Sequence, residues 1–159
     1  MSSLEQLYQQ VILDHAARKD GRGADPEALQ ASSHQVNPTC GDEVTLGVSI
    51  IDEGAGARIS DLRWEGDGCS ISQASLSILT DLVDGKPLGE VSEMYAAMEQ
   101  MMHSRGQGVP DDLLDLLEDG AALEGTSKFP NRIKCALLGW YALRDSLAKL
   151  GTDIAEESK

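Results

Sequence analysis

Apolar residues recur along the first part of the chain with two different periods. Between residues 4 and 15 they follow one another at intervals of three and four, which predicts an amphipathic helix. Residues 44–50 and 57–64 instead alternate apolar with polar side chains, and a glycine-containing turn separates the two runs. We therefore expect a β-hairpin, with residues 31–36 as a candidate third strand of a small sheet.

After Gly68 the apolar pattern becomes helical and stays so. The spacing predicts helices over residues 71–83, 94–102, 110–117 and 130–147. Ser92 is placed to cap the second of these helices, and Pro110 and Pro130 are placed to begin the third and the fourth. The last helix is apolar around most of its circumference, so we expect it at the centre of the core.

These elements predict an α+β fold in which a small three-stranded antiparallel sheet packs against helices. At 159 residues the chain is long enough for one domain with its own core, which we assign to residues 1–150. Residues 151–159 are polar and acidic, and we expect a flexible acidic tail there.

The charge of the chain limits the classes of molecule that it is expected to bind. The chain has 13 Lys and Arg residues against 27 Asp and Glu, a net charge of -14, so its surface would repel nucleic acids and anionic membranes. We expect a basic or neutral protein partner instead. No run approaches the roughly 20 apolar residues needed to span a bilayer, and no N-terminal targeting segment is seen, which favours a cytoplasmic protein. Its three cysteines cannot all pair, so we expect thiols or metal ligands.

All three cysteines lie at or near junctions between predicted elements. Cys40 precedes the first strand of the hairpin in a Cys-x-Asp pattern with Asp42, Cys69 lies where the second strand turns into a helix, and Cys135 lies in the second turn of the last helix. Three sulfurs and one carboxylate would make the four ligands of a tetrahedral ion, and zinc accepts both donor types. The spacing alone is equally compatible with three buried cysteines that act as small apolar residues.

A resemblance to a known family favours the metal site. The segments Asn-Pro-Thr-Cys-Gly-Asp at 37–42, Gly-Asp-Gly-Cys-Ser-Ile-Ser at 66–72 and Ser-Lys-Phe-Pro-Asn-Arg-Ile-Lys-Cys-Ala at 127–136 resemble signatures of SufU proteins, within the wider IscU/NifU-like family. Leu-Tyr-Gln-Gln-Val-Ile-Leu-Asp-His at 7–15 is similar too. The resemblance implies the SufE/IscU-like fold and a zinc-dependent sulfurtransferase of iron–sulfur cluster assembly.

Two details within the resemblance distinguish a sulfurtransferase from a scaffold protein for iron–sulfur clusters. The scaffold branch of the family has a His directly before the third cysteine, whereas this chain has Lys134. The segment between the methionine-containing helix and Lys128 is similar to the insertion that marks the SufU branch. Both details favour a sulfurtransferase. The alternatives are a scaffold that carries an iron–sulfur cluster and a non-enzymatic adaptor that zinc stabilises.

The resemblance also implies partners and roles. A pyridoxal-phosphate-dependent cysteine desulfurase of the SufS type would supply persulfide sulfur, and downstream cluster assembly proteins would receive it. We predict Cys40 as the acceptor, because the adjacent Gly41 lets its loop move more easily than a helix. Arg132 and Lys134 are expected near the site, where their charges would offset those of the ligands.

Three other features are predicted to be structural. His15 continues the apolar stripe of the first helix and is expected to be packed or hydrogen-bonded at the edge of the core. The methionines of residues 94–102 are expected to fill the core, and the acidic residues of 111–119 to form a solvated face.

Overall fold

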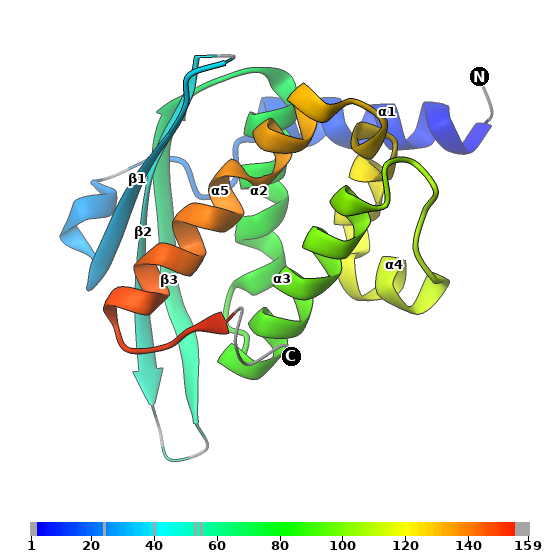
Figure 1. The fold of residues 1–159 in the computed structure, drawn as a ribbon. Coiled ribbons are helices and arrows are strands. Elements are labelled where there is room, and N and C mark those ends of the chain that lie inside the picture. Colours follow the sequence, from blue (N-terminus) through cyan, green and yellow to red (C-terminus); the bar gives the residue numbers. More distant parts are fainter. Residues whose placement is uncertain (1–2, 24, 40, 53, 55, 155–159) are drawn as a thin grey trace.

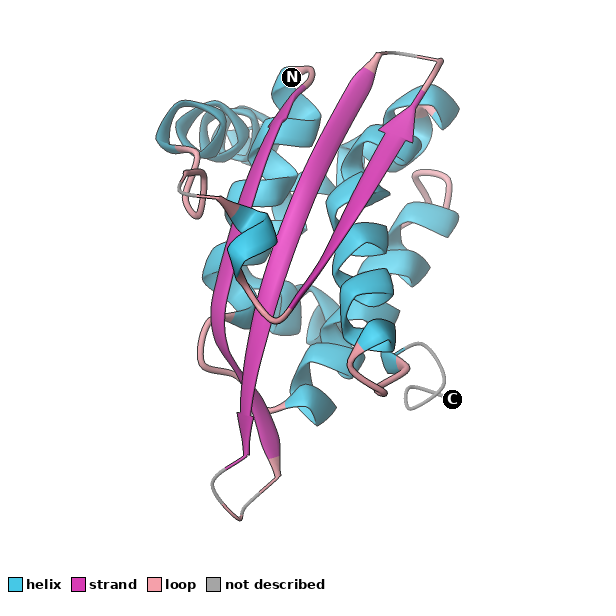
Figure 2. Cartoon of the chain, turned by 90° about the vertical axis from the view of Figure 1, so that its left-hand side faces the viewer, coloured by secondary structure: helices cyan, strands magenta, loops and turns pink. Residues whose placement is uncertain are grey.

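The computed structural model describes residues 3–23, 25–39, 41–52, 54 and 56–154 of the chain. Its elements are the α-helices α1 (Ser3–Arg18), α2 (Ser70–Val83), α3 (Leu88–His103), α4 (Asp111–Leu117) and α5 (Pro130–Lys149), the 3-10 segments η1 (Pro26–Ala28) and η2 (Glu118–Lys128), and the strands β1 (Ala31–Asn37), β2 (Asp42–Asp52) and β3 (Ala57–Asp67). The α-helices lie on one side of the sheet, and η1 lies on the other (Figures 1 and 2). The predicted α+β fold is confirmed.

The sheet is antiparallel with the order β1-β2-β3, so all the predicted strands form, each close to its predicted limits. Val44, Leu46 and Val48 of β2 are fully buried, as the alternation predicts. The register places Asn37, the last residue of β1, opposite Asp42, the first residue of β2. The connection between these strands therefore lies at the same end of the molecule as the N-terminal ends of α2 and α5 (Figure 1).

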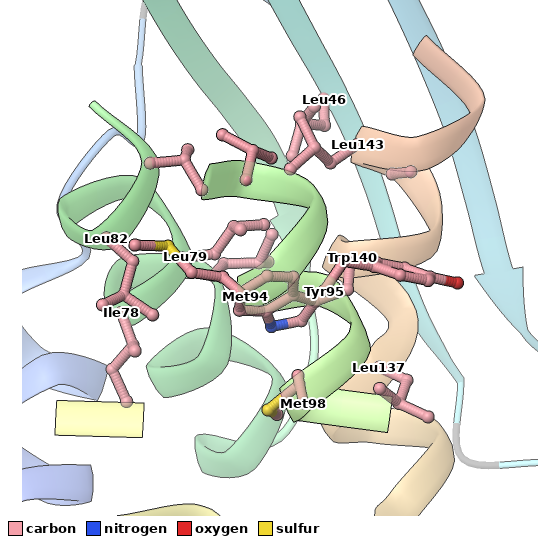
Figure 3. Close-up of a cluster of buried hydrophobic side chains, with 14 of the residues drawn as sticks. Leu46, Ile78, Leu79, Leu82, Met94, Tyr95, Met98, Leu137, Trp140 and Leu143 are labelled. Carbon is pink, nitrogen blue, oxygen red and sulfur yellow. The ribbon is translucent and has the colours of Figure 1, made fainter. Parts of the chain in front are cut away.

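The core lies between the sheet and the helical layer. Trp140 of α5 is 1% exposed and lies in one cluster with Tyr95 of α3 and Leu79 of α2 (Figure 3). The methionines of α3 are buried in the same cluster, which confirms that they fill the core: Met94, Met98, Met101 and Met102. The prediction that the last helix is central is also confirmed, because α5 contacts β1, β2 and α2.

Three elements differ from the prediction. Helix α3 begins at Leu88 rather than at Ser92, because Pro87 fixes an extended backbone just before it. Ser92 is buried within the helix, where its hydroxyl donates to the backbone oxygen of Ile154. Ile154 lies inside the expected tail and is fully buried, while residues 155–159 lie outside the described residues. The 3-10 segments η1 and η2 were not predicted.

Helix α1 attaches through its C-terminal end and leaves much of its apolar side exposed. His15 is 1% exposed; its Nδ1 lies 2.8 Å from Ser77 Oγ and its Nε2 lies 2.9 Å from Asp119 Oδ2. The prediction of a hydrogen-bonded histidine is confirmed. Leu4 and Leu13, in contrast, are more than half exposed. No helix in the described part of the chain is both long and apolar enough to cross a membrane.

Candidate metal centre

Three of the four predicted ligands come from three different elements and meet at one end of the sheet. Asp42 begins β2, Cys69 is the residue directly before α2, and Cys135 lies in the second turn of α5. Each offers a ligand atom, and these atoms all lie within 4.8 Å of one another. Cys40, the fourth predicted ligand, lies outside the described residues.

The spacing of these atoms fits a tetrahedral zinc ion. The Cys69 Sγ–Asp42 Oδ2 distance is 3.8 Å. Zinc bonds of about 2.3 Å to sulfur and about 2.0–2.2 Å to oxygen, at tetrahedral angles, place two such ligand atoms about 3.5 Å apart. A soft thiolate pair with one carboxylate is also a donor set that zinc accepts. The described ligands thus need only small movements to surround the ion.

A backbone donor orients the buried carboxylate of Asp42. The Cys69 N–H, at the start of α2, donates to Asp42 Oδ1 at 3.0 Å. This bond leaves Oδ2 on the side of the Cys69 sulfur, and the helix N-terminus stabilises the negative charge. Asp42 is 1% exposed and Cys135 is 4% exposed, whereas Cys69 is exposed, so the site opens to solvent on the Cys69 side.

Gly68 leaves the space in which this carboxylate lies. A Cβ atom at position 68 would lie 2.2 Å from Ser72 Oγ and 2.7 Å from Asp42 Oδ1. We therefore expect Gly68→Ala to displace the carboxylate and lower zinc affinity about 10-fold or more, as chelator competition would measure. Gly89→Ala is the matched control, since outside its own stretch of helix no described atom lies within 4 Å of the added Cβ. Equal zinc affinity in the two variants would contradict the role of Gly68.

The two predicted neighbouring cations occupy different surroundings. The Arg132 guanidinium stacks over the Phe129 ring, 4.6 Å from its centroid, and lines a groove that also reaches Cys69 and Cys135. Lys134 is exposed on the next turn of α5. Of the two, Arg132 is the one that lines the same groove as Cys69 and Cys135.

The groove is a feature that the sequence analysis missed. Its volume is about 1090 Å³, and its walls are α1, η2 and the beginning of α5. Apolar side chains of Leu4, Ile12 and Phe129 line it. Burial raises the pKa of Tyr8, another wall residue, and the carboxylates of Glu124 and Asp111 raise it further. The helical pattern predicts an apolar side for α1, but it does not show that the leucines of this side remain exposed.

A second group of titratable residues, His15, Asp20 and Asp81, also has ligand atoms within 4.8 Å of one another. Both ring nitrogens of His15 already have hydrogen-bond partners. Arg18 pairs with Asp20 and, at 3.0 Å, with Asp81. We interpret this group as an ion-pair network that anchors the end of α1.

Comparison with known proteins agrees with the geometry. The family model of the NifU-like N-terminal domain matches residues 7–148, so the chain belongs to this family. It is 38% identical over 148 residues to the zinc-dependent sulfurtransferase SufU of Bacillus subtilis (strain 168), covering 93% of this chain and 94% of that protein. It is 35% identical to the iron–sulfur cluster assembly scaffold protein IscU of Streptococcus pyogenes serotype M1, covering 94% of this chain and 87% of that protein.

Solved structures show the same fold. A crystal structure of a protein described as hypothetical superposes with a TM-score of 0.75 at 36% identity, covering 90% of this chain and 98% of that one. A putative iron–sulfur cluster assembly scaffold protein for the SUF system from Fervidobacterium islandicum AW-1 gives a TM-score of 0.66 at 30% identity, covering 92% and 99%. The resemblance predicted from the signature segments is thus confirmed.

Proposed function

We propose that this chain is a zinc-bound sulfur acceptor that takes persulfide sulfur from a pyridoxal-phosphate-dependent cysteine desulfurase and passes it to downstream cluster assembly proteins. The observation that supports it most is the convergence of Asp42, Cys69 and Cys135 in a chain 38% identical to a zinc-dependent sulfurtransferase. Thiols of this kind persist in a reducing compartment such as the cytoplasm.

Cys40, Asp42, Cys69 and Cys135 would hold the zinc ion. When bound, zinc supplies a charge that keeps cysteine thiols deprotonated near neutral pH. Three thiolates and one carboxylate around a divalent ion leave a net charge of about -2. The N–H at the start of α2 and the Arg132 guanidinium would offset part of that charge.

Sulfur acceptance requires a thiolate, which we assign to Cys40. This thiolate attacks the terminal sulfur of the desulfurase persulfide, so that a new S–S bond forms on Cys40 while the S–S bond of the donor breaks. The desulfurase cysteine leaves as a thiolate, and no external oxidant or reductant is needed. Gly41, next to Cys40, has a φ of +75°, and apart from its chain neighbours no described atom lies within 4 Å of the position of a Cβ there. Glycine adopts this conformation without strain and is not restrained by side-chain packing, which supports the loop next to it as the place of the acceptor.

The groove offers a surface on which the desulfurase could dock. It leads to Cys69 and Cys135, and Lys128 and Arg132 are among the residues that line it. Exposed apolar surface beside a reactive centre is typical of an interaction site. The net charge of -14 further favours a partner whose docking surface is basic or neutral.

A scaffold that builds an iron–sulfur cluster on the same ligands is the second candidate. The relatives at 35% and 31% identity that are named as IscU scaffold proteins favour it. Lys134 in place of the histidine of the scaffold branch argues for transfer. A non-enzymatic zinc-stabilised adaptor would bind the desulfurase without accepting sulfur.

Desulfurase turnover tests the proposal. Zinc-loaded protein should raise the rate of alanine formation from cysteine, whereas the metal-free protein, at the same concentration, should not. If this chain were a scaffold, iron and sulfide would instead give a stable coloured cluster that transfers to an apo-protein. An unchanged desulfurase rate with the zinc-loaded protein would contradict the sulfurtransferase proposal.

A further inference from the structure

A buried histidine joins α1 to two other elements beside the groove. His15 of α1 is 1% exposed, and its Nδ1 lies 2.8 Å from Ser77 Oγ of α2. Its Nε2 lies 2.9 Å from Asp119 Oδ2, near the start of η2. Helix α1 and segment η2 are two walls of the groove, so the bond to Asp119 links one wall to the other.

The hydrogen bonds around Ser77 assign the position of the proton on the His15 ring. The Asp20 N–H donates to Ser77 Oγ at 3.0 Å, and Ser77 is fully buried. Among the described residues, His15 Nδ1 is the acceptor within reach of the Ser77 hydroxyl proton. If Nδ1 itself carried a proton, this hydroxyl would be a buried donor without an acceptor, which is costly. Nδ1 therefore accepts, and the ring proton lies on Nε2, which donates to the Asp119 carboxylate.

Further bonds fix the C-terminal end of α1 to α2. Arg18 pairs with Asp20 and, at 3.0 Å, with Asp81 of α2. The Asp20 N–H, two residues beyond the end of α1, binds Ser77 of the same helix α2. The bond from His15 to Asp119 extends this anchor to a third element. It therefore holds η2 against the fixed end of α1.

The part of α1 that lines the groove has little packing of its own. The structure describes every residue of α1, and His15 is the one that is fully buried. The residues of α1 that line the groove all lie within residues 4–13, and Leu4, Leu7 and Leu13 are more than half exposed. With so few buried apolar contacts, the separation of α1 and η2 depends strongly on the polar bond between them.

We propose that the His15–Asp119 hydrogen bond sets the width of the groove on which the desulfurase docks. This inference rests on the docking role proposed for the groove. Neither residue lines the groove itself, so both act through the walls that they join and are positioning residues for docking. A groove that is held at one width loses less conformational freedom when a partner binds. The bond thus strengthens docking without making a contact to the partner.

Desulfurase binding by variants of Asp119 tests this proposal. The Asp119 side chain is 60% exposed, so its truncation removes the bond without leaving a cavity in the core. Asp119→Ala should raise the Kd for the desulfurase about 10-fold in calorimetry. Asp119→Asn keeps an oxygen that can accept from His15 Nε2, and its Kd should stay within about 2-fold of the wild-type value. The desulfurase rate at saturating protein, and the zinc affinity, should be unchanged in both variants.

Two results of this experiment would overturn the proposal. One is a wild-type Kd in Asp119→Ala, because the bond would then contribute nothing to docking. The other is a lowered desulfurase rate at saturation with an unchanged Kd, because the bond would then act on sulfur transfer rather than on docking.

Asp145→Ala is the matched control. The Asp145 side chain is 47% exposed and accepts a hydrogen bond at 2.7 Å from the buried Ser33. This bond joins α5 to β1, and neither of its residues lines the groove. The control should lose stability in thermal unfolding and yet bind the desulfurase with the wild-type Kd. An equal loss of docking in Asp119→Ala and Asp145→Ala would reveal a general loosening of the fold and would contradict the proposal.

Amide hydrogen exchange tests the same bond in the absence of the desulfurase. In Asp119→Ala the amides of residues 118–128 should exchange faster than in the wild-type protein, because η2 loses its link to α1. The amides of β2, on the other side of the core, should exchange at the wild-type rate. Asp119→Asn should restore the protection of η2. Equal exchange of η2 in Asp119→Ala and the wild-type protein would overturn the positioning role.

The two hypotheses fail in different ways. A wild-type protein that accepts sulfur, together with an Asp119→Ala variant that binds the desulfurase equally well, refutes the positioning role alone. A wild-type protein that accepts no sulfur refutes the sulfurtransferase function, whereas faster exchange of η2 in Asp119→Ala would still support the bond between the two walls.

Discussion

Replacing Cys40 with alanine should abolish persulfide acceptance completely. The thiolate at this position is the proposed nucleophile, and alanine has no atom on which a new S–S bond could form. Intact-mass spectrometry after incubation with desulfurase and cysteine should show no added sulfur on the variant. Because Asp42, Cys69 and Cys135 remain within ligand distance of one another, the variant should still bind zinc when zinc is in excess, with water as the fourth ligand and with a lowered affinity.

Zinc content is the control for this variant. A Cys40→Ala protein that holds zinc and gains no sulfur has lost the acceptor rather than the metal site. A variant that still gains one sulfur would contradict the assignment of Cys40 and would direct attention to Cys69, the exposed one of the two described cysteines.

Replacing Asp42 with alanine should lower zinc affinity by more than about 100-fold, because it removes one of four ligands rather than a supporting residue. It also deprives the Cys69 N–H of its acceptor, which should cost about 1–3 kcal/mol of stability even without metal. Chelator competition measures the first effect, and thermal unfolding of the metal-free protein measures the second.

The isosteric variant Asp42→Asn separates these two effects. Its amide oxygen can still accept the Cys69 N–H, so the metal-free protein should unfold near the wild-type temperature. Its zinc affinity should nevertheless fall, because the charged ligand is lost. Wild-type zinc affinity in Asp42→Asn would contradict the role of Asp42 as a ligand.

The parts of the fold that the sequence predicts are those fixed by local periodicity and by burial. The alternation of Val44, Leu46 and Val48 predicted β2 because one face of the strand is fully buried. The apolar circumference of α5 predicted its central place because a helix with so little polar surface needs neighbours on most sides. Neither prediction required knowledge of distant contacts.

The remaining features depend on contacts between distant parts of the chain. Ser92 resembles a cap, but it is buried, and it bonds to Ile154. The 3-10 segment η2 has no clear period of its own and packs between α1 and α5, so its form is set by its neighbours. The stripe on α1 correctly indicates a helix, but the groove that Leu4 and Leu13 line depends on the packing of η2 and α5.

The sequence predicts which residues form the candidate site better than it predicts how these residues are arranged in space. Cysteines and a carboxylate at element junctions indicated a metal site, and the signature segments indicated its family. That Asp42 and Cys69, 27 residues apart, lie 3.8 Å from each other follows only from the pairing of β2 with β3 and from the turn into α2.

The most direct test of the sulfurtransferase function is the mass of the zinc-loaded wild-type protein after incubation with a cysteine desulfurase and cysteine. We predict a gain of one sulfur atom, located on Cys40 by peptide mapping, and no gain when the desulfurase is left out. An unchanged mass, in protein shown to hold zinc and to bind the desulfurase, would contradict the function and favour a non-enzymatic adaptor.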